Sequence, residues 1–342
     1  MCCKGVVLVT GANGYIGART VEAFLNAGYS VRGAVRSQSA GQGLRDALAK
    51  AVSDSRLDIV QVPDITVSGA YDDAVKGVTA IAHLASPVSF NFTDSEYVVG
   101  TAVNSVKSIL ASAKKEPGVK HFVFMSSIVA IIGENLEGHI FTEADWNDVA
   151  PKAVVEQGDA ATGRQIYGAS KTLAERAFWS FREEQEPAFT MNTVNPVLVG
   201  GPPLVLPSDP DMITETVRFI WKVFSGEPIP DSSGFGAYVD VRDVARLVVF
   251  SVEHGSDVNK QRYIALSGWG SPQAAADILR QKYSQTDRIQ EGAPHRDYLP
   301  DYSFPPQAPQ IDTSHAVKAT GQGWIGFDTM VLDTAKAFEH YL

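Results

Sequence analysis

Short apolar runs alternate with amphipathic stretches along the first 195 residues of this 342-residue chain. The apolar runs have the length of buried β-strands and lie at 6–9, 31–35, 58–62, 79–82, 121–125 and 189–194. Apolar positions with helical spacing fill 15–27, 42–52, 95–115 and 165–185. This alternation predicts an α/β fold built on a Rossmann-type, doubly wound parallel sheet. Ligands of such sheets bind beyond the carboxyl ends of the strands, so we expect the site residues there.

The pattern changes after Asn195. Proline and glycine interrupt the chain at 200–203, 226–230 and 294–309, around one expected helix at 211–224. We expect these segments not to complete the first sheet and to form a smaller, discontinuous C-terminal substrate lobe. The predicted domains are a dinucleotide-binding domain over 1–195, with a return segment at about 238–252, and a lobe that takes most of 196–342.

The first predicted strand runs into a glycine-rich turn and then into a helix, an order typical of a dinucleotide-binding site. Gly11 permits the tight turn, Gly14 lets the backbone approach the pyrophosphate, and Gly17 allows the helix to pack closely on the strand. The phosphates would lie at the helix N-terminus. The spacing is GxxGxxG rather than GxGxxG. The cofactor-binding residues predicted from this segment are Thr10, Gly11, Asn13, Gly14, Tyr15, Ile16 and Gly17.

The second strand indicates which dinucleotide binds. An NAD site usually has an Asp or Glu about 20 residues into the motif, but no carboxylate occurs from 23 to 45. Alternation along a strand points Arg32 and Arg36 to the same side. Arg36 falls where the strand ends, so its guanidinium can bind a 2′-phosphate with Ser37 assisting. We predict NADP, with Arg36 as the stronger candidate; the other interpretation is that both arginines are solvated surface residues.

Tyr167 and Lys171 are four residues apart ahead of a helix-favouring run, which puts both side chains on one helix face. A neighbouring cation favours the phenolate and lowers the pKa of a tyrosine from its usual value of about 10. Such a pair can do acid/base chemistry. Alone, the spacing also fits an amphipathic Tyr beside a solvated Lys.

Together these motifs resemble the extended short-chain dehydrogenase/reductases, in the branch of dihydroflavonol reductase, cinnamoyl-CoA reductase and the fungal and yeast carbonyl (aldehyde) reductases. The resemblance covers nearly the whole chain, through 10–17, 31–36, 64–65, 83–86, 124–127, 167–171, 195–196, 201–202 and 238–245. It implies that Ser127 is the catalytic serine, Tyr167 the proton donor and Lys171 the residue that holds the nicotinamide ribose. Asn104 aligns with the fourth catalytic member, although Thr101-Ala-Val-Asn departs from the common Gly-Thr-x-Asn.

The same resemblance implies further contacts to NADP. Asp64, followed by Ile65, corresponds to the acid near the adenine, and Leu84, Ala85 and Ser86 to the backbone beside the ribose. Pro196, Val197, Leu198 and Val199 correspond to the loop over the nicotinamide. Candidates that line the substrate pocket are mainly apolar, and for each the alternative is ordinary core packing. They are Ser86, Val88, Phe90, Phe92, Val129, Val199, Trp221, Phe224 and Tyr238, beside Ser127 and Tyr167.

The predicted reaction is NADPH-dependent reduction of a ketone or aldehyde to an alcohol, on a hydrophobic or aryl carbonyl substrate. Three alternatives stay open. They are a hydroxysteroid-type or other alcohol dehydrogenase working in the oxidative direction, a sugar-nucleotide epimerase or dehydratase, and a non-enzymatic NADP sensor. The missing acid after the second strand counts against the NAD-retaining epimerases, and the intact Tyr-Lys pair counts against a sensor. The sequence leaves the substrate, the stereochemistry and the choice between monomer and homodimer undetermined.

Composition and charge narrow the partners. The net charge of −10 provides no basic stripe for nucleic acid. Cys2 and Cys3 form neither a disulfide framework nor a zinc spacing, and the histidines lack metal-ligand spacing, so we expect no metal. No apolar run approaches the 18 or so residues of a membrane span, and the N-terminus lacks a signal peptide. We therefore predict a cytoplasmic protein that binds a small carbonyl substrate.

Overall fold

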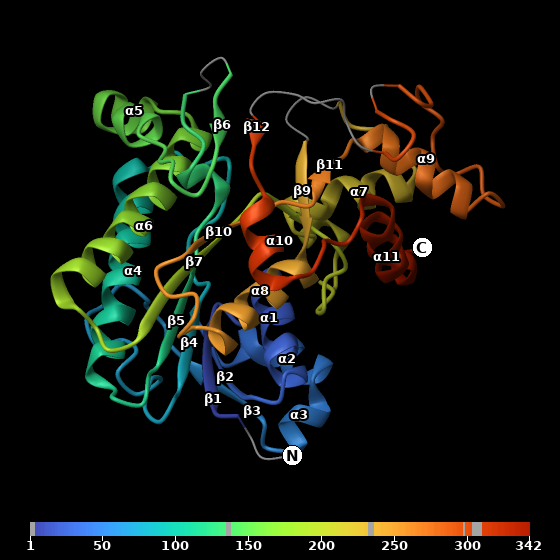
Figure 1. Cartoon of the computed structure of the whole chain (residues 1–342). Coiled ribbons are helices and arrows are strands. Elements are labelled where there is room, and N and C mark those ends of the chain that lie inside the picture. Colours follow the sequence, from blue (N-terminus) through green and yellow to red (C-terminus); the bar gives the residue numbers. More distant parts are fainter. Residues whose placement is uncertain (1–3, 135–137, 232–235, 297, 303–309) are drawn as a thin grey trace.

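Seven parallel strands form the main sheet, in the order β10-β7-β5-β4-β1-β2-β3 (Figure 1). The structure is a computed structural model, and it describes residues 4–134, 138–231, 236–296, 298–302 and 310–342; Cys2 and Cys3 lie outside these ranges. The parallel sheet confirms the predicted fold class. The strands are β1 (Val6–Thr10), β2 (Ser30–Val35), β3 (Leu57–Gln61), β4 (Ala80–His83), β5 (His121–Met125), β7 (Thr190–Pro196) and β10 (Arg262–Ala265).

The seventh strand, β10, was not among the strands predicted from the sequence. It pairs in parallel with β7, so that Arg262 lies opposite Thr193. The run Arg-Tyr-Ile-Ala has only four residues and begins with a charged one. It therefore lacks the continuous apolar pattern by which the other strands were predicted. Only the neighbouring strand β7 gives this segment a hydrogen-bonding edge.

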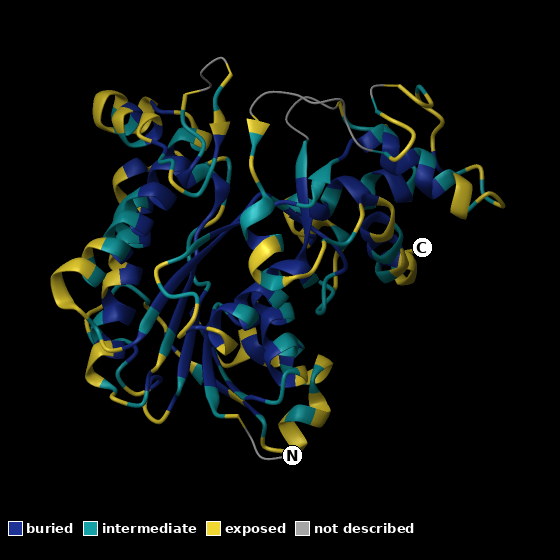
Figure 2. Cartoon of the chain, in the orientation of Figure 1, coloured by how far each residue is buried: buried dark blue, intermediate teal, exposed yellow. Residues whose placement is uncertain are grey.

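Helices cover both faces of the sheet, because successive residues of a strand point to opposite sides. In β1, Val7 and Val9 join the core formed with α1 (Tyr15–Asn26) and α8 (Val241–Glu253). Leu8 points the other way, into the core formed with α4 (Ser95–Lys115) and α6 (Gly163–Gln185). Figure 2 shows the strands as the most buried layer between these helices. The amphipathic pattern of the helices thus follows from a sheet that is buried on both sides.

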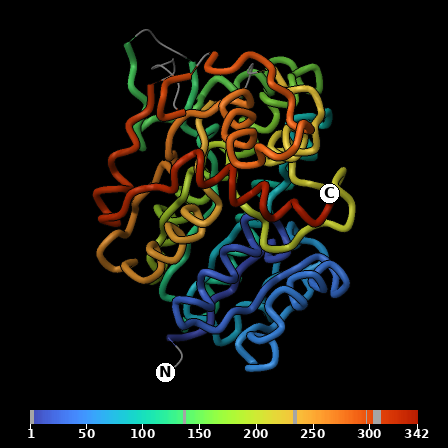
Figure 3. Tube along the Cα trace, turned by 90° about the vertical axis from the view of Figure 1, so that its right-hand side faces the viewer, coloured from blue at the N-terminus to red at the C-terminus, as the bar shows by residue number. Residues whose placement is uncertain are grey.

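A second, smaller core lies beyond the carboxyl ends of these strands. It contains α7 (Glu215–Ser225), α9 (Pro272–Lys282) and α11 (Phe327–Phe338), which pack on a three-stranded sheet. In a view at right angles to the first, these segments lie above the blue N-terminal strands (Figure 3). The remaining elements are the strands β8 (Leu198–Gly200), β9 (Ala237–Asp240) and β11 (Gly268–Trp269) of that sheet, the strand pair β6 (Ile140–Phe141) and β12 (Gln310–Ile311), and the helices α2 (Gln42–Ala47), α3 (Ala49–Ser53), α5 (Val149–Gln157) and α10 (Ser314–Thr320).

Two predicted helices have different bounds in the structure. The stretch 42–52 forms two short helices, α2 and α3, because the backbone of Leu48 leaves the helical region at ψ 34°. The helix expected at 211–224 begins only at Glu215, after a 3₁₀ turn at Pro210–Met212, and it ends at Gly226 in the left-handed conformation with φ 94°. Within the described residues, no helix combines the length and the apolar character that a membrane span requires.

Candidate active site

The ends of β1 and β4 are joined by the side chain of Thr10. Its Oγ1 accepts hydrogen bonds from the backbone N–H groups of Leu84 and Ala85, both at 3.0 Å, and lies 2.8 Å from Nδ1 of His83. Thr10 and His83 are fully buried. The hydroxyl of Thr10 therefore positions the chain at Leu84 and Ala85, and the contact of Thr10 with the cofactor stays a prediction.

The glycine turn has the geometry that a dinucleotide needs. Gly11 has φ 64°, and a Cβ there would lie 3.2 Å from the backbone of Ala85. A Cβ at Gly17 would lie 2.0 Å from the carbonyl oxygen of Gly11, so the helix can approach the turn only with glycine here. Asn13 and Gly14 are exposed. Helix α1 has no side-chain cap at its N-terminus and no acidic residue in its first turn, so its free N–H groups suit a pyrophosphate.

Tyr15 extends this turn toward the second lobe. Its hydroxyl donates a hydrogen bond of 2.7 Å to the carbonyl oxygen of Gly201, and burial raises the pKa of this phenol well above its usual value. Ile16 packs beside it against the main core. The loop after β7 lies close by: Val197 N–H donates to Ala265, and both Val197 and Val199 are buried in the main core.

The two arginines of the second strand have different surroundings. Nη1 of Arg32 donates hydrogen bonds of 2.8 and 2.7 Å to the carbonyl oxygens of Ala74 and Lys76, which favours a structural role, and the assignment of Arg32 to NADP stays a prediction. Arg36 lies just past β2, is exposed, and makes no hydrogen bond or ion pair with the described residues. This leaves Arg36 as the guanidinium available to a 2′-phosphate.

The other residues near the predicted adenine end are local turn residues. Ser37 is partly buried, and its hydroxyl lies 3.0 Å from that of Ser39. The exposed carboxylate of Asp64 accepts hydrogen bonds from the N–H and the hydroxyl of Thr66, which lower its pKa. Ile65 packs at the edge of the core under α4 and α6.

Helix α6 and the end of β5 carry the three residues proposed for catalysis. The helix begins after Thr162, whose side chain and that of Gln165 form a reciprocal capping box. This start places Tyr167 and Lys171 on the buried face, with exposures of 8% and 3%. Ser127 follows β5 and is 7% exposed. The ammonium of Lys171 lies 5.9 Å from the centre of the Tyr167 ring.

Burial decides the protonation of this pair. It lowers the pKa of Lys171 to about 8, while the nearby carboxylate of Glu175 opposes this shift. Burial also raises the pKa of Tyr167, and the hydrogen bond with Ser127 only partly offsets the rise. The loss of solvation of the phenolate is the larger of these two effects, and the lowering of the Tyr167 pKa by Lys171 stays a prediction.

A buried carboxylate that the sequence analysis missed, that of Glu175, binds residues next to this site. Glu175 is fully buried one helical turn after Lys171. It accepts hydrogen bonds from Ser126, from Thr193 at 3.2 Å and from Asn195 at 2.8 Å, and an ion pair of 2.7 Å from Arg262. Asn195 in turn donates to the carbonyl oxygen of Ser127 at 3.2 Å. In the sequence, only the helical spacing of Lys171 and Glu175 could have indicated that Glu175 belongs to the site. The other residues that contact Glu175 are far from it along the chain.

Asn104 does not join the site. Its side chain is exposed on α4, in line with Tyr97, Gly100 and Lys107, which form the outward stripe of that helix. The buried positions of α4, among them Ala102, lie on the other side. The catalytic role of Asn104 stays a prediction.

Phe90 is the substrate candidate that the structure brings to Tyr167. The two rings meet edge to face at 5.4 Å, and the guanidinium of Arg164 lies 5.5 Å from the Phe90 ring. The loop is held against the start of α6, since a Cβ at Gly163 would lie 2.2 Å from the Phe90 carbonyl oxygen. Phe92 packs as a partly buried side chain beside Ile166 of α6. Ser86 and Val129 are partly buried, whereas Val88 is 64% exposed.

Of the candidates from the second lobe, Phe224 and Tyr238 lie in its core and Trp221 packs against it. Phe224 is 1% exposed and packs on Tyr283, with the ring centres 4.8 Å apart. Trp221 contacts Phe338 and Tyr341, and Tyr238 packs on Phe327. These contacts favour core packing for Phe224, whereas Tyr238 also lines a small pocket and Trp221 is only partly buried, so the assignments to the substrate pocket stay predictions. Val199 likewise belongs to the main core.

The fold and the site define an α/β enzyme that binds a dinucleotide. Residues 7–265 match the model of the NAD dependent epimerase/dehydratase family, and the chain belongs to this family. The chain is 30% identical to a ketoreductase of Aspergillus niger, over 96% of this chain and 95% of that protein. It is 32% identical to the NADPH-dependent methylglyoxal reductase of Saccharomyces cerevisiae, over 81% of this chain and 82% of that protein.

Solved structures agree with these relatives. The structure of yeast methylglyoxal/isovaleraldehyde reductase complexed with NADPH is similar with a TM-score of 0.82 and 27% identity, over 98% of each chain. Vestitone reductase from alfalfa shares the fold, with a TM-score of 0.75 at 21% identity over 99% of each chain. The predicted family and the assignment to the oxidoreductases are confirmed.

Proposed function

We propose that this protein is an NADPH-dependent reductase that converts a ketone or aldehyde to an alcohol. The observation that carries the proposal is the position of Ser127, Tyr167 and Lys171, buried together beyond the carboxyl end of β5. The uncapped start of α1 and the unpaired Arg36 suit the pyrophosphate and the 2′-phosphate of NADPH. The NADPH-dependent methylglyoxal reductase among the relatives supports the same cofactor.

NADPH supplies the hydride when it is bound. Ser127 and Tyr167 donate hydrogen bonds to the carbonyl oxygen of the substrate, where negative charge develops. Tyr167 then gives its proton to that oxygen. Because burial raises its pKa, the phenol stays protonated at neutral pH and is ready to act as an acid.

The substrate class follows from the neighbours of Tyr167. Phe90 covers the phenol and is partly exposed, so it presents an aromatic surface to the carbonyl compound. We infer a substrate with an apolar or aryl group next to the carbonyl, small enough to fit beside this ring. The cytoplasmic location expected from the sequence stays a prediction.

The test is a screen of ketones and aldehydes that follows NADPH consumption, repeated with Tyr167→Phe. This variant removes only the hydroxyl, so kcat should fall by about 10²-fold or more while NADPH affinity, measured by fluorescence titration, is nearly unchanged. Phe178→Tyr, a matched change in the buried face of the same helix, controls for effects of a single hydroxyl on the fold. Normal turnover in Tyr167→Phe would refute the mechanism, whereas the absence of turnover on every substrate in the parent protein would favour the NADP sensor.

A further inference from the structure

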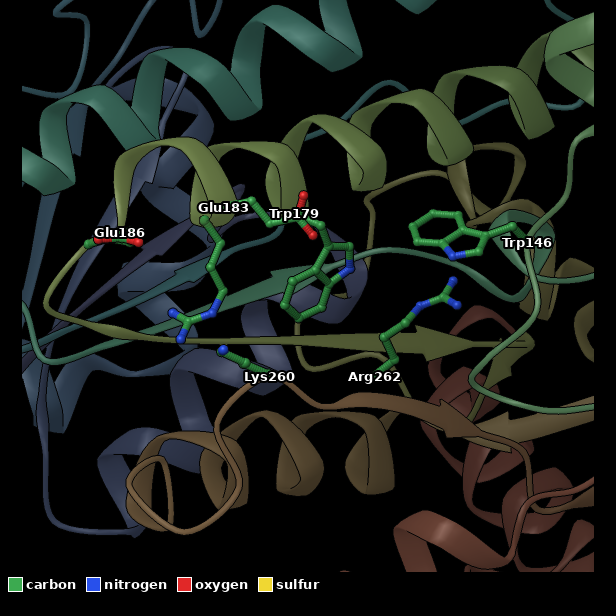
Figure 4. Close-up of a pocket in the computed structure, with 8 residues that line it drawn as sticks. Trp146, Trp179, Glu183, Glu186, Lys260 and Arg262 are labelled. Carbon is green, nitrogen blue, oxygen red and sulfur yellow. The ribbon is translucent and has the colours of Figure 1, made fainter.

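A surface pocket of about 610 Å³ lies beside the amino ends of β7 and β10, whereas Ser127 lies past the carboxyl end of β5. Its lining comes from the end of α6, the segment before β10 and the loop that follows β6 (Figure 4). The volume lies in the range of about 300–1,000 Å³ that small-molecule sites occupy. Nothing in the proposed reduction uses this pocket.

Two indole rings give the pocket an aromatic wall. Trp146 and Trp179 both line it, and Figure 4 shows the Arg262 side chain reaching toward Trp146. The guanidinium carbon of Arg262 lies 4.0 Å from the centre of the Trp146 ring. Hydrogen bonds of 2.6 and 2.7 Å to the carbonyl oxygens of Glu143 and Asp145 fix the loop that carries Trp146. These contacts hold Trp146 in a defined position in the wall of the pocket.

Three cationic side chains line the same pocket. The Arg262 side chain is only 9% exposed, and its Nη2 has no hydrogen-bond partner in the part of the chain that the structure describes. Within those same residues, Arg182 and Lys260 make no side-chain hydrogen bond or ion pair, and Nε of Arg182 is buried. Buried donors without partners are costly, and an anion would satisfy them.

The charged side chains of the pocket also limit the number of charges that the anion can carry. Glu183 and Glu186 line the pocket from the exposed end of α6, and the structure pairs neither carboxylate with a cation of the pocket. Glu183 and Glu186 offset the charges of Arg182 and Lys260, and Glu175 neutralises Arg262 at 2.7 Å, so the pocket has no excess positive charge. A polyanion such as a nucleotide is therefore disfavoured, whereas a monoanion can be held by the donors that have no partner among the described residues.

We propose that this pocket binds a small aromatic monocarboxylate. Its ring would pack on the indole of Trp179, and its carboxylate would accept hydrogen bonds from Arg182 and Lys260, near Nη2 of Arg262, which has no partner among the described residues. The site is separate from the proposed carbonyl site, and the proposal does not depend on the reaction.

Isothermal titration calorimetry of the whole protein with sodium benzoate tests the proposal. We expect saturable binding with one benzoate per chain and a Kd on the order of 1 mM, as suits a ligand of this size. Benzamide, which has the same shape without the charge, should not bind. Arg182→Gln and Lys260→Gln should each weaken benzoate binding by about 5-fold or more. Lys282→Gln, an exposed lysine on α9, is the matched control and should leave the Kd unchanged.

Three results would overturn the proposal. One is the absence of saturable heat with benzoate. Another is an equal Kd for benzoate and benzamide, which would show that the cations contribute nothing. The third is an unchanged Kd in both Arg182→Gln and Lys260→Gln, which would place the benzoate elsewhere, including the catalytic cleft. Thermal unfolding of each variant confirms that it is folded.

Discussion

At the scale of single residues, burial controls the chemistry more strongly than neighbouring charges do. Lys171 is buried beside the ring of Tyr167, and burial lowers its pKa to about 8. The same environment raises the pKa of Tyr167. A charged ammonium is therefore maintained at neutral pH at a cost to the fold, as is common for residues that serve catalysis.

This cost predicts that Lys171→Met stabilises the protein while it reduces activity. Unfolding returns the pKa of Lys171 from about 8 to its ordinary value of 10.5. Between these values the unfolded chain binds more protons, so the stability of the parent protein should rise with pH through this window. The variant should lack this rise and should be more stable at pH 7 by roughly 1–3 kcal/mol. Urea unfolding between pH 7 and 10 measures both effects; a loss of stability at pH 7 would contradict the prediction.

At the scale of elements, two arginines at β2 have different surroundings. Arg32 lies inside the strand and binds the carbonyl oxygens of Ala74 and Lys76. Arg36 lies past the strand end, exposed and unpaired among the described residues. The position relative to the strand end therefore separates an arginine with backbone partners from one without partners among the described residues, which supports the proposed role of Arg36.

We predict that Arg36→Ala removes most of the preference for NADPH over NADH. A charge-assisted hydrogen bond contributes roughly 1.5–3 kcal/mol, so the preference in kcat/KM should fall on the order of 10-fold or more. Arg32→Ala is the matched comparison; it should lower the thermal unfolding midpoint and keep the cofactor preference. Equal kcat/KM values for the two cofactors in the parent protein would exclude the role of Arg36.

At the scale of the whole molecule, aromatic residues divide between the carbonyl site and the core of the second lobe. Phe90 contacts Tyr167 and is partly exposed. Phe224 is 1% exposed and contacts Tyr283 and the guanidinium of Arg288, both in the second lobe. Two phenylalanines that look alike in the sequence thus have separate roles.

Substitution by alanine should separate these roles. Phe224→Ala should cost about 3–5 kcal/mol of stability and leave the ranking of bulky against small carbonyl substrates intact. Phe90→Ala should change that ranking with a smaller loss of stability, because its side chain is only partly buried. Unfolding midpoints and kcat/KM on a substrate panel measure both quantities. An altered ranking in Phe224→Ala would return this helix to the substrate site.

The sequence by itself determined the features that depend on local pattern. The alternation of apolar strands and helices specified the parallel sheet, and the spacing of Gly11, Gly14 and Gly17 specified the dinucleotide turn, because these patterns arise from neighbouring residues. The helical spacing of Tyr167 and Lys171 placed both on the buried face of α6.

Only the tertiary structure decided the features that join distant segments. Glu175 receives its partners from Ser126, Asn195 and Arg262, which lie 49, 20 and 87 residues away along the chain. β10 has an edge to pair with only after β7 is in place. The pKa of Tyr167 depends on how completely the fold excludes water, a quantity that no local spacing encodes.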